Sequence, residues 1–169
     1  MKFLLPASDS WHLFQPGEGI VPARALIALA AWQGLDARQR DELAASARLG
    51  LLLPNDVDVE SLQDELGSFE LVALQFPRWT DGRAYTQARL LRLRLRFEGE
   101  IRAVGQVLVD MLLPLARSGF DAAVLREDQE LAAARRALDF FPGHYQIDAR
   151  RPLARPVGLV PSYFAAHAS

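Results

Sequence analysis

Residues capable of binding or acid–base chemistry are concentrated in one short stretch of this sequence. They are Arg78, Thr80, Asp81, Gly82 and Arg83. A carboxylate can act as a general base or anchor a substrate, and guanidinium groups bind planar or tetrahedral anions. The residue types therefore indicate a place for chemistry on an anionic ligand, with Asp81 as the candidate catalytic group. They do not name a reaction.

The segments on either side explain how this stretch would be positioned. Residues 70–76 form an apolar run that predicts a buried strand, and residues 84–96 predict a helix because Ala84, Ala88, Leu91 and Leu95 recur on one side of it. The loop between them then lies at the carboxyl end of a strand and the amino end of a helix. In parallel α/β folds, ligands bind at such loops.

Local capping gives the same residues a purely structural interpretation. Asp81 or Thr80 can accept hydrogen bonds from the first free N–H groups of the helix, and Gly82 allows a turn that other residues resist. Arg83 either adds to an anion site at the helix start or forms an ion pair within the loop. The sequence leaves both interpretations open.

Composition limits the class of protein. At 169 residues the chain fits a single domain, and its net charge of −2 argues against nucleic acid as a partner. A membrane-spanning helix needs about 20 apolar residues, and no apolar run in the sequence approaches that length. The amino terminus makes a poor secretory signal. The absence of Cys excludes disulfides, thiolate nucleophiles and Cys-based metal or iron–sulfur sites. We expect a soluble, cytoplasmic protein.

The order of patterned segments predicts an α/β fold. Apolar runs at residues 25–30, 49–53, 69–76, 100–104 and 120–125 alternate with helical segments, which indicates about five mostly parallel strands in an open sheet. A partial barrel resembling a TIM barrel is the alternative. We expect one domain over residues 25–140. Residues 1–24 would be an extension with a short edge strand, and residues 141–169 a tail that is extended, partly disordered, or docked on the domain or on a second chain.

Parallel strands place their carboxyl ends on one edge of the sheet, where further candidates would gather. Arg126 follows the last predicted strand, and Arg89 lies on the flank of the central helix. Arg102 falls inside a predicted strand, where a buried guanidinium would need an acid such as Asp81 or Asp121. The predicted ligand-binding set is Arg78, Thr80, Asp81, Gly82, Arg83, Arg89, Arg102 and Arg126.

Motifs for known cofactors and metals are missing. Neither a G-x-G-x-x-G nor a P-loop occurs, and His12, His144 and His167 lack the spacing of metal ligands. We expect no metal site. The cofactor stays undetermined, and a flavin stays open because flavin sites share no universal motif.

Three stretches together resemble an uncharacterised bacterial family, domain of unknown function 934. They are FPRWTDGRAYTQARLLR (76–92), GEIRAVG (99–105) and RSGFDA (117–122). The matching positions that carry over as candidates are Asp81, Gly82, Arg83, Arg89, Arg92, Arg102 and Asp121. The family often has Cys where this chain has Ser118, so no thiol role transfers to that position.

The resemblance implies a role in assimilatory sulfate or sulfite reduction, because genes of this family commonly neighbour those for sulfite reductase. An accessory protein that binds an oxyanion or phosphate-like ligand, or that docks on the reductase, would fit this context. The alternative is a small enzyme acting on an anionic substrate, since the family carries an oxidoreductase label. A homo-oligomer is also open.

Overall fold

The computed structural model describes residues 1–17 and 19–139, and its central feature is a parallel β-sheet. Seven strands form this sheet within the described residues, in the order β1-β7-β6-β5-β4-β3-β2, and every neighbouring pair is parallel. The strands are β1 (Lys2–Leu4), β2 (His12–Phe14), β3 (Arg24–Ala28), β4 (Arg48–Leu53), β5 (Leu71–Phe76), β6 (Glu100–Gly105) and β7 (Ala122–Val124).

Helical segments connect successive strands, as parallel pairing requires. The α-helices are α1 (Leu29–Gln33), α2 (Ala37–Ser46), α3 (Arg83–Leu93), α4 (Leu112–Ser118) and α5 (Leu131–Asp139). Short 3-10 turns are η1 (Pro6–Ser8), η2 (Val59–Leu62), η3 (Leu66–Ser68) and η4 (Val109–Met111). The N-terminus of α2 is closed by a capping box: Asp36 accepts a hydrogen bond from the Gln39 N–H at 2.8 Å, and the Gln39 side-chain oxygen accepts from the Asp36 N–H at 3.0 Å. None of the described helices is long and apolar enough to cross a membrane.

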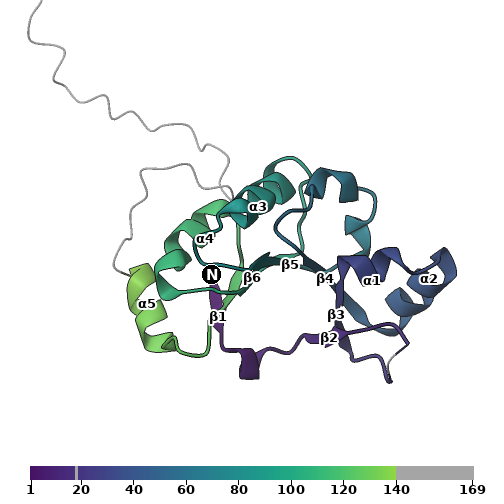
Figure 1. Cartoon of the computed structure of the whole chain (residues 1–169), viewed down its shortest axis with the longest axis horizontal. Coiled ribbons are helices and arrows are strands. Elements are labelled where there is room, and N and C mark those ends of the chain that lie inside the picture. Colours follow the sequence, from purple (N-terminus) through teal and green to yellow (C-terminus); the bar gives the residue numbers. More distant parts are fainter. Residues whose placement is uncertain (18, 140–169) are drawn as a thin grey trace, which may run out of the picture.

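The sheet curls into an open half-barrel. Strands β2 to β7 follow one another in chain order, whereas β1 and β2, which are consecutive in the chain, lie at opposite edges. Figure 1 shows the strands as an arc, with the helices outside it and the segment between β1 and β2 running across its open side. The prediction of an α/β fold with an open sheet or partial barrel is confirmed.

The strand count differs from the prediction. All five expected strands are present, and the first 14 residues add two more, where the sequence indicated a single short edge piece. Both added strands have only three residues, which is too short for a hydrophobic period to be recognised. They are held by pairing with β7 and β3, a tertiary contact that no local pattern reveals.

The two faces of the sheet differ in what covers them. On the outer face, under the helices, alternate strand residues such as Val72, Leu74 and Phe76 join the main hydrophobic core. We call the opposite, concave side the inner face. Its side chains come from Leu4, Leu26, Ala28, Leu52, Leu71, Ala73, Gln75, Arg102, Val104, Ala122 and Val124, with Gly50 among them.

Helix α3 packs on the outer face as its pattern predicts, but it ends earlier. Ala84, Ala88 and Leu91 are fully buried. The helix stops at Leu93, and the chain turns at Arg96 with φ 51° so that the Phe97 N–H donates to the Leu91 carbonyl at 2.8 Å. Because Phe97 is drawn back into the core, the helix ends before Arg96, the last residue of the predicted helix. The tail predicted for residues 141–169 lies outside the described residues.

Arg92 is the polar centre of the amino-terminal edge. Its guanidinium donates to the carbonyl groups of Gly119 at 3.0 Å and Gly99 at 2.9 Å, to that of Phe97, and to the Asp121 carboxylate. The Asp121 carboxylate also accepts from the Ile101 N–H at 2.8 Å. This network joins α3 to the starts of β6 and β7, so Arg92 and Asp121, which the resemblance offered as candidates, stabilise the fold.

Replacing Arg92 with Ala should lower the free energy of unfolding by roughly 2–4 kcal/mol, because it removes the donor of three carbonyl groups and the partner of Asp121. Urea unfolding followed by circular dichroism measures the loss. The matched control is Arg89→Ala on the same helix, where the side chain is exposed, and it should change stability by less than about 0.5 kcal/mol. Equal losses in the two variants would contradict the network.

Gly105 allows the end of β6 to approach β5 closely. It has φ +96°, and a Cβ atom there would lie 2.6 Å from the Phe76 carbonyl oxygen. Gly105→Ala should therefore destabilise the protein by at least about 1–3 kcal/mol in urea unfolding. Gly67→Ala serves as the control because nothing lies within 4 Å of its added Cβ. A Gly105→Ala variant as stable as the control would show that this turn relaxes freely.

Candidate functional site

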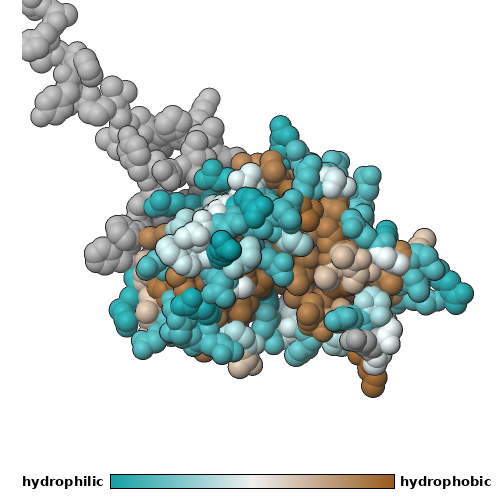
Figure 2. Space-filling model, viewed as in Figure 1, coloured by the Kyte–Doolittle hydropathy of each residue, from teal (hydrophilic) through white to brown (hydrophobic). Residues whose placement is uncertain are grey.

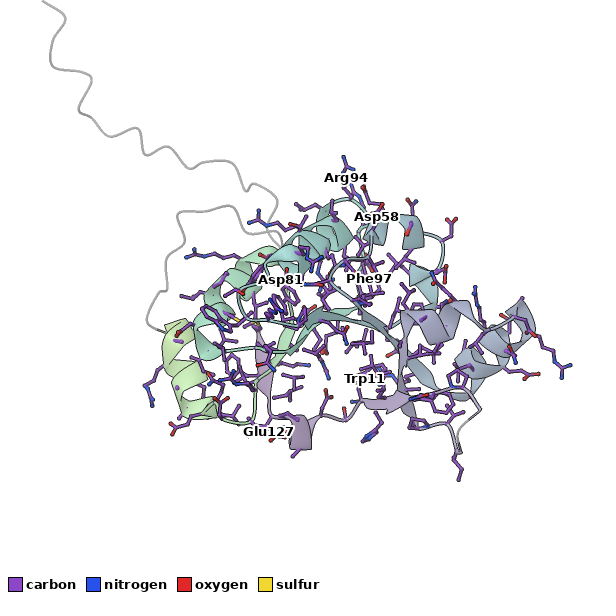
Figure 3. All side chains as sticks on the ribbon, viewed as in Figure 1. Trp11, Asp58, Asp81, Arg94, Phe97 and Glu127 are labelled. Atoms are coloured by element: carbon purple, nitrogen blue, oxygen red, sulfur yellow. The ribbon has the colours of Figure 1, made fainter. Side chains whose placement is uncertain are left out.

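The carboxyl ends of all seven strands share one edge, and the polar loops expected there follow β4, β5, β6 and β7. Contacts divide these loops into two groups. One is formed by Asn55, Asp81 and Arg83, and the other by Gln106, Arg126 and Asp128. Among the described residues, no hydrogen bond or ion pair joins the two groups. Figure 3, which labels Asp81 and Glu127, shows the two loops well apart.

The first group is centred on a bidentate ion pair between Arg83 and Asp81. Arg83 Nε donates to Asp81 Oδ1 at 3.0 Å, and Arg83 Nη2 donates to Asp81 Oδ2 at 2.7 Å. The Arg83 backbone N–H also donates to Asp81 Oδ1 at 3.3 Å, so Asp81 does accept from the start of α3. The bond from the Arg83 guanidinium is the main reason that the pKa of Asp81 lies well below its usual range. A carboxylate held this firmly in its ionised form suits an anchor better than a base.

Asn55 lies beneath this pair and is only 7% exposed. Its amide lies close enough to the Asp81 carboxylate to help lower the Asp81 pKa, yet Nδ2 forms no hydrogen bond of normal geometry within the described part. Gln87 of α3 fixes the same loop from the other side, because its Nε2 donates to the carbonyl groups of Pro54 and Val57, each at 2.9 Å. The loop after β4 is therefore tied to α3, a role of Gln87 that the sequence pattern did not reveal.

The remaining residues of the β5–α3 loop face solvent. Arg78 and Thr80 are exposed, and Trp79 is 59% exposed. The Arg78 carbonyl accepts from the Asp81 N–H at 3.0 Å, but the Arg78 guanidinium makes no hydrogen bond or ion pair with any described residue. Gly82 has φ −84°, which other residues adopt readily, so the prediction that this turn needs glycine is wrong.

The second group is a compact ion pair after β7. Arg126 donates to Asp128 from Nε at 2.6 Å and from Nη2 at 2.5 Å, while its Nη1 reaches Gln106 Oε1 at 3.2 Å. The Arg126 guanidinium is the main cause that lowers the pKa of Asp128 to about 2. Gln106 accepts this bond through its side-chain oxygen, so its amide N–H groups take no part in it.

Two of the predicted ligand-binding residues lie away from this edge. Arg102 points onto the inner face at mid-strand and is 5% exposed; it donates to Asp9 and to Glu100, the latter at 2.7 Å from Nε. The expected partners, Asp81 and Asp121, are wrong, because Asp81 stands at the carboxyl edge and Asp121 is bonded to Arg92. Arg89 is exposed on α3 and forms no hydrogen bond or ion pair with either polar group.

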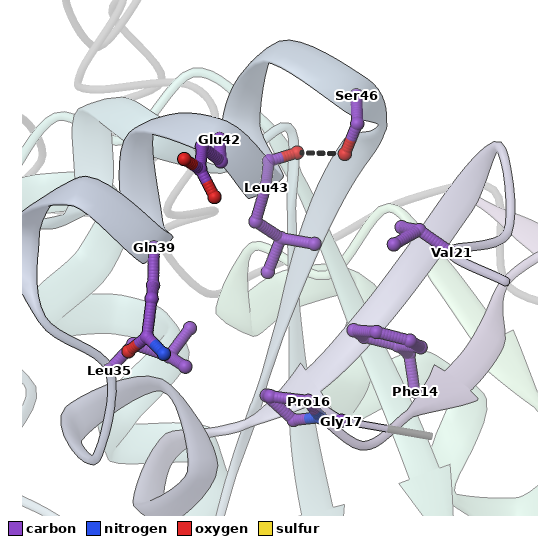
Figure 4. Close-up of a pocket in the computed structure, with 9 residues that line it drawn as sticks. All are labelled: Phe14, Pro16, Gly17, Val21, Leu35, Gln39, Glu42, Leu43 and Ser46. Carbon is purple, nitrogen blue, oxygen red and sulfur yellow. Dashed lines mark hydrogen bonds between the residues drawn. The ribbon is translucent and has the colours of Figure 1, made fainter. Parts of the chain in front are cut away.

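Away from this edge, the molecule has a mostly apolar cavity. A cavity of about 380 Å³ lies between α2 and the segment after β2, and its apolar lining includes Phe14, Val21, Leu35 and Leu43 (Figure 4). The Ser46 hydroxyl at its border donates to the Leu43 carbonyl at 3.0 Å. In the described part of the chain, no group of three or more His, Cys, Asp or Glu side chains is placed to hold a metal ion.

The fold and these loops define a small α/β protein with a curled parallel sheet and two polar groups at its carboxyl edge. A family model matches residues 50–155, and the chain belongs to that family, which is described as a bacterial protein of unknown function (DUF934). No curated protein matches the sequence.

Replacing Arg83 with Ala should raise the pKa of Asp81 toward the value of a free aspartate, since the Arg83 guanidinium is its main stabilising partner. A folded-state pKa that is lowered stabilises the protein at neutral pH, and this contribution is lost as the pH falls through that value. A pH titration followed by NMR of the carboxyl carbons measures the change. Arg78→Ala should leave the Asp81 titration unchanged, and an unchanged titration in Arg83→Ala would contradict the assignment.

Proposed function

We propose that this protein is an accessory, ligand-binding protein of assimilatory sulfate and sulfite reduction. It holds a small oxyanion or a phosphate-like group at the loop between β5 and α3. The observation that carries the proposal is the exposed Arg78 guanidinium, which has no ionic partner among the described residues and belongs to the same loop as the Arg83–Asp81 pair. An unpaired guanidinium offers several donors at the geometry of a tetrahedral anion.

The surrounding groups fit this role. The Ala84 N–H group belongs to the first turn of the 11-residue helix α3, where negative charge is stabilised. Asp81 keeps Arg83 oriented across the helix start through both carboxylate oxygens. The link to sulfite reduction is supported by the family resemblance and its gene neighbours, and docking on sulfite reductase is part of the same proposal. Exposed Trp79 would be a contact for that partner.

The alternative is a small enzyme that acts on an anionic substrate at the same loops. It is favoured by the buried Asn55 amide beside Asp81, since polar groups without ordinary partners occur at functional sites. In that role Asp81 would position the substrate or an attacking group and would not serve as a base, because its pKa is lowered.

Isothermal titration with sulfite, sulfate and adenylylated sulfate tests the ligand. We expect saturable binding of at least one anion, and Arg78→Ala should weaken it by roughly tenfold, which corresponds to the about 1.5–3 kcal/mol of a charge-assisted hydrogen bond at its lower end. Arg38→Ala is the matched control, because Arg38 is exposed on α2 and pairs only with Glu42 in the described part.

Affinity capture with purified sulfite reductase tests the partner. We expect Trp79→Ala to reduce capture and Leu93→Ala, which removes another exposed apolar side chain, to leave it unchanged. If none of the anions and no reductase bind to the wild-type protein, the accessory role is wrong.

A further inference from the structure

Helix α2 is incompletely packed against the rest of the molecule. Leu43 is its one buried residue, whereas a surface helix of this length normally buries a stripe along one side. The cavity of about 380 Å³ lies under that side of the helix, against Phe14 and Val21 (Figure 4), and Glu42 and Ser46 of α2 stand at its border. The helix thus leaves a mostly apolar cavity open between itself and the β2 edge of the sheet.

The segment between β2 and β3 forms the opposite wall of this cavity and also carries an exposed apolar side chain. Ile20 is 95% exposed and is the sequence neighbour of Val21, which lines the cavity. Figure 2 shows a hydrophobic projection at the lower right of the molecule, where Figure 1 places this segment. Single exposed apolar side chains are common, but one that adjoins an apolar cavity extends it into a larger apolar surface, which marks an interaction site.

The exposed charges of α2 complement those of a second copy of the same helix. Arg38 and Glu42 are one turn apart, with side chains 86% and 62% exposed, and they bond to each other at 2.8 Å. A two-fold axis through the middle of α2 sets the helix antiparallel to its copy, so that Arg38 of each copy faces Glu42 of the other. Each charge then keeps its partner within the chain and gains one across the axis. A network of four alternating charges is more stable than two separate exposed pairs.

We propose that this surface is the interface of a homodimer, with a two-fold axis close to the middle of α2 and Ile20 of each copy inserted into the cavity of the other. A two-fold interface must be self-complementary, and a surface that carries both a projection and a cavity meets this condition. Ile20 buries its side chain against Phe14 and Leu43, while Arg38 and Glu42 fix the relative position of the two helices.

The interface lies at the β2 edge of the sheet and uses none of the residues of the loop between β5 and α3. The homodimer is therefore independent of the proposed function. Loss of anion binding in Arg78→Ala would not bear on it, and loss of the dimer in an interface variant would not bear on the anion site.

Sedimentation velocity of the full-length protein over a concentration series tests the dimer. We expect a concentration-dependent dimer, and Ile20→Asp should raise its dissociation constant at least about tenfold because it places a charge in the apolar cavity. The matched control is Leu93→Asp, which alters another exposed apolar side chain and should leave the dissociation constant unchanged. Wild-type protein that stays monomeric at every concentration, as it would if another part of the same chain filled the cavity, overturns the proposal. So does a dimer that Ile20→Asp leaves unaffected.

Charge reversal tests the contact between the two α2 helices. Arg38→Glu and Glu42→Arg should each weaken the dimer at least about fivefold, because like charges then meet across the axis. An equimolar mixture of the two variants should form a heterodimer, since every pair across the axis again joins opposite charges. Arg94→Glu is the control, because Arg94 is 67% exposed just after α3 and pairs with Glu60, and it should leave the dimer unchanged. A mixture that stays monomeric overturns the proposal.

Discussion

The buried Arg102 guanidinium is the constraint on which the arrangement of the sheet depends. A charge in the middle of a central strand must be paired, since an unpaired buried charge costs several kcal/mol. Glu100 supplies one partner from the same strand, and Asp9 supplies the other from 93 positions away in the sequence. The segment between β1 and β2 must therefore cross the inner face. By doing so it places β1 and β2 on opposite edges of the curled sheet and covers the amino half of its concave side.

This division gives the two ends of the sheet different roles. The amino-terminal edge is held by the Arg92–Asp121 network, in which charged groups are satisfied by backbone and by each other. The carboxyl edge carries loops whose charges are exposed and only locally paired. A rigid base with polar loops at the opposite edge is the common basis for binding sites on parallel sheets, because the scaffold fixes the loop ends while the loop residues remain free for ligands.

The candidate residues that the family resemblance suggested fall into two groups in the structure. Arg92, Arg102 and Asp121 are tied into the fold by ion pairs and contribute to its stability. Asp81 and Arg83 form a pair at the start of α3 in which the Arg83 side chain is exposed, so stability gains little from this ion pair. An exposed pair in a loop at the carboxyl edge has a stronger claim to function than a buried one in the scaffold, and this distinction cannot be drawn from residue identity.

Patterns among residues close together in the sequence determined most of the central strands and the packing side of the central helix. Apolar runs of five or more residues predicted the central strands, and the stripe of Ala84, Ala88 and Leu91 predicted the packing side of α3. The cap at Asp81 also follows from neighbours in the chain. Tertiary structure alone decided the rest. Strands of three residues form only because distant strands pair with them, and the partners of Arg102 depend on how the chain crosses the sheet. Short-range patterns encode which side of an element is apolar, but they do not encode which other element will cover it.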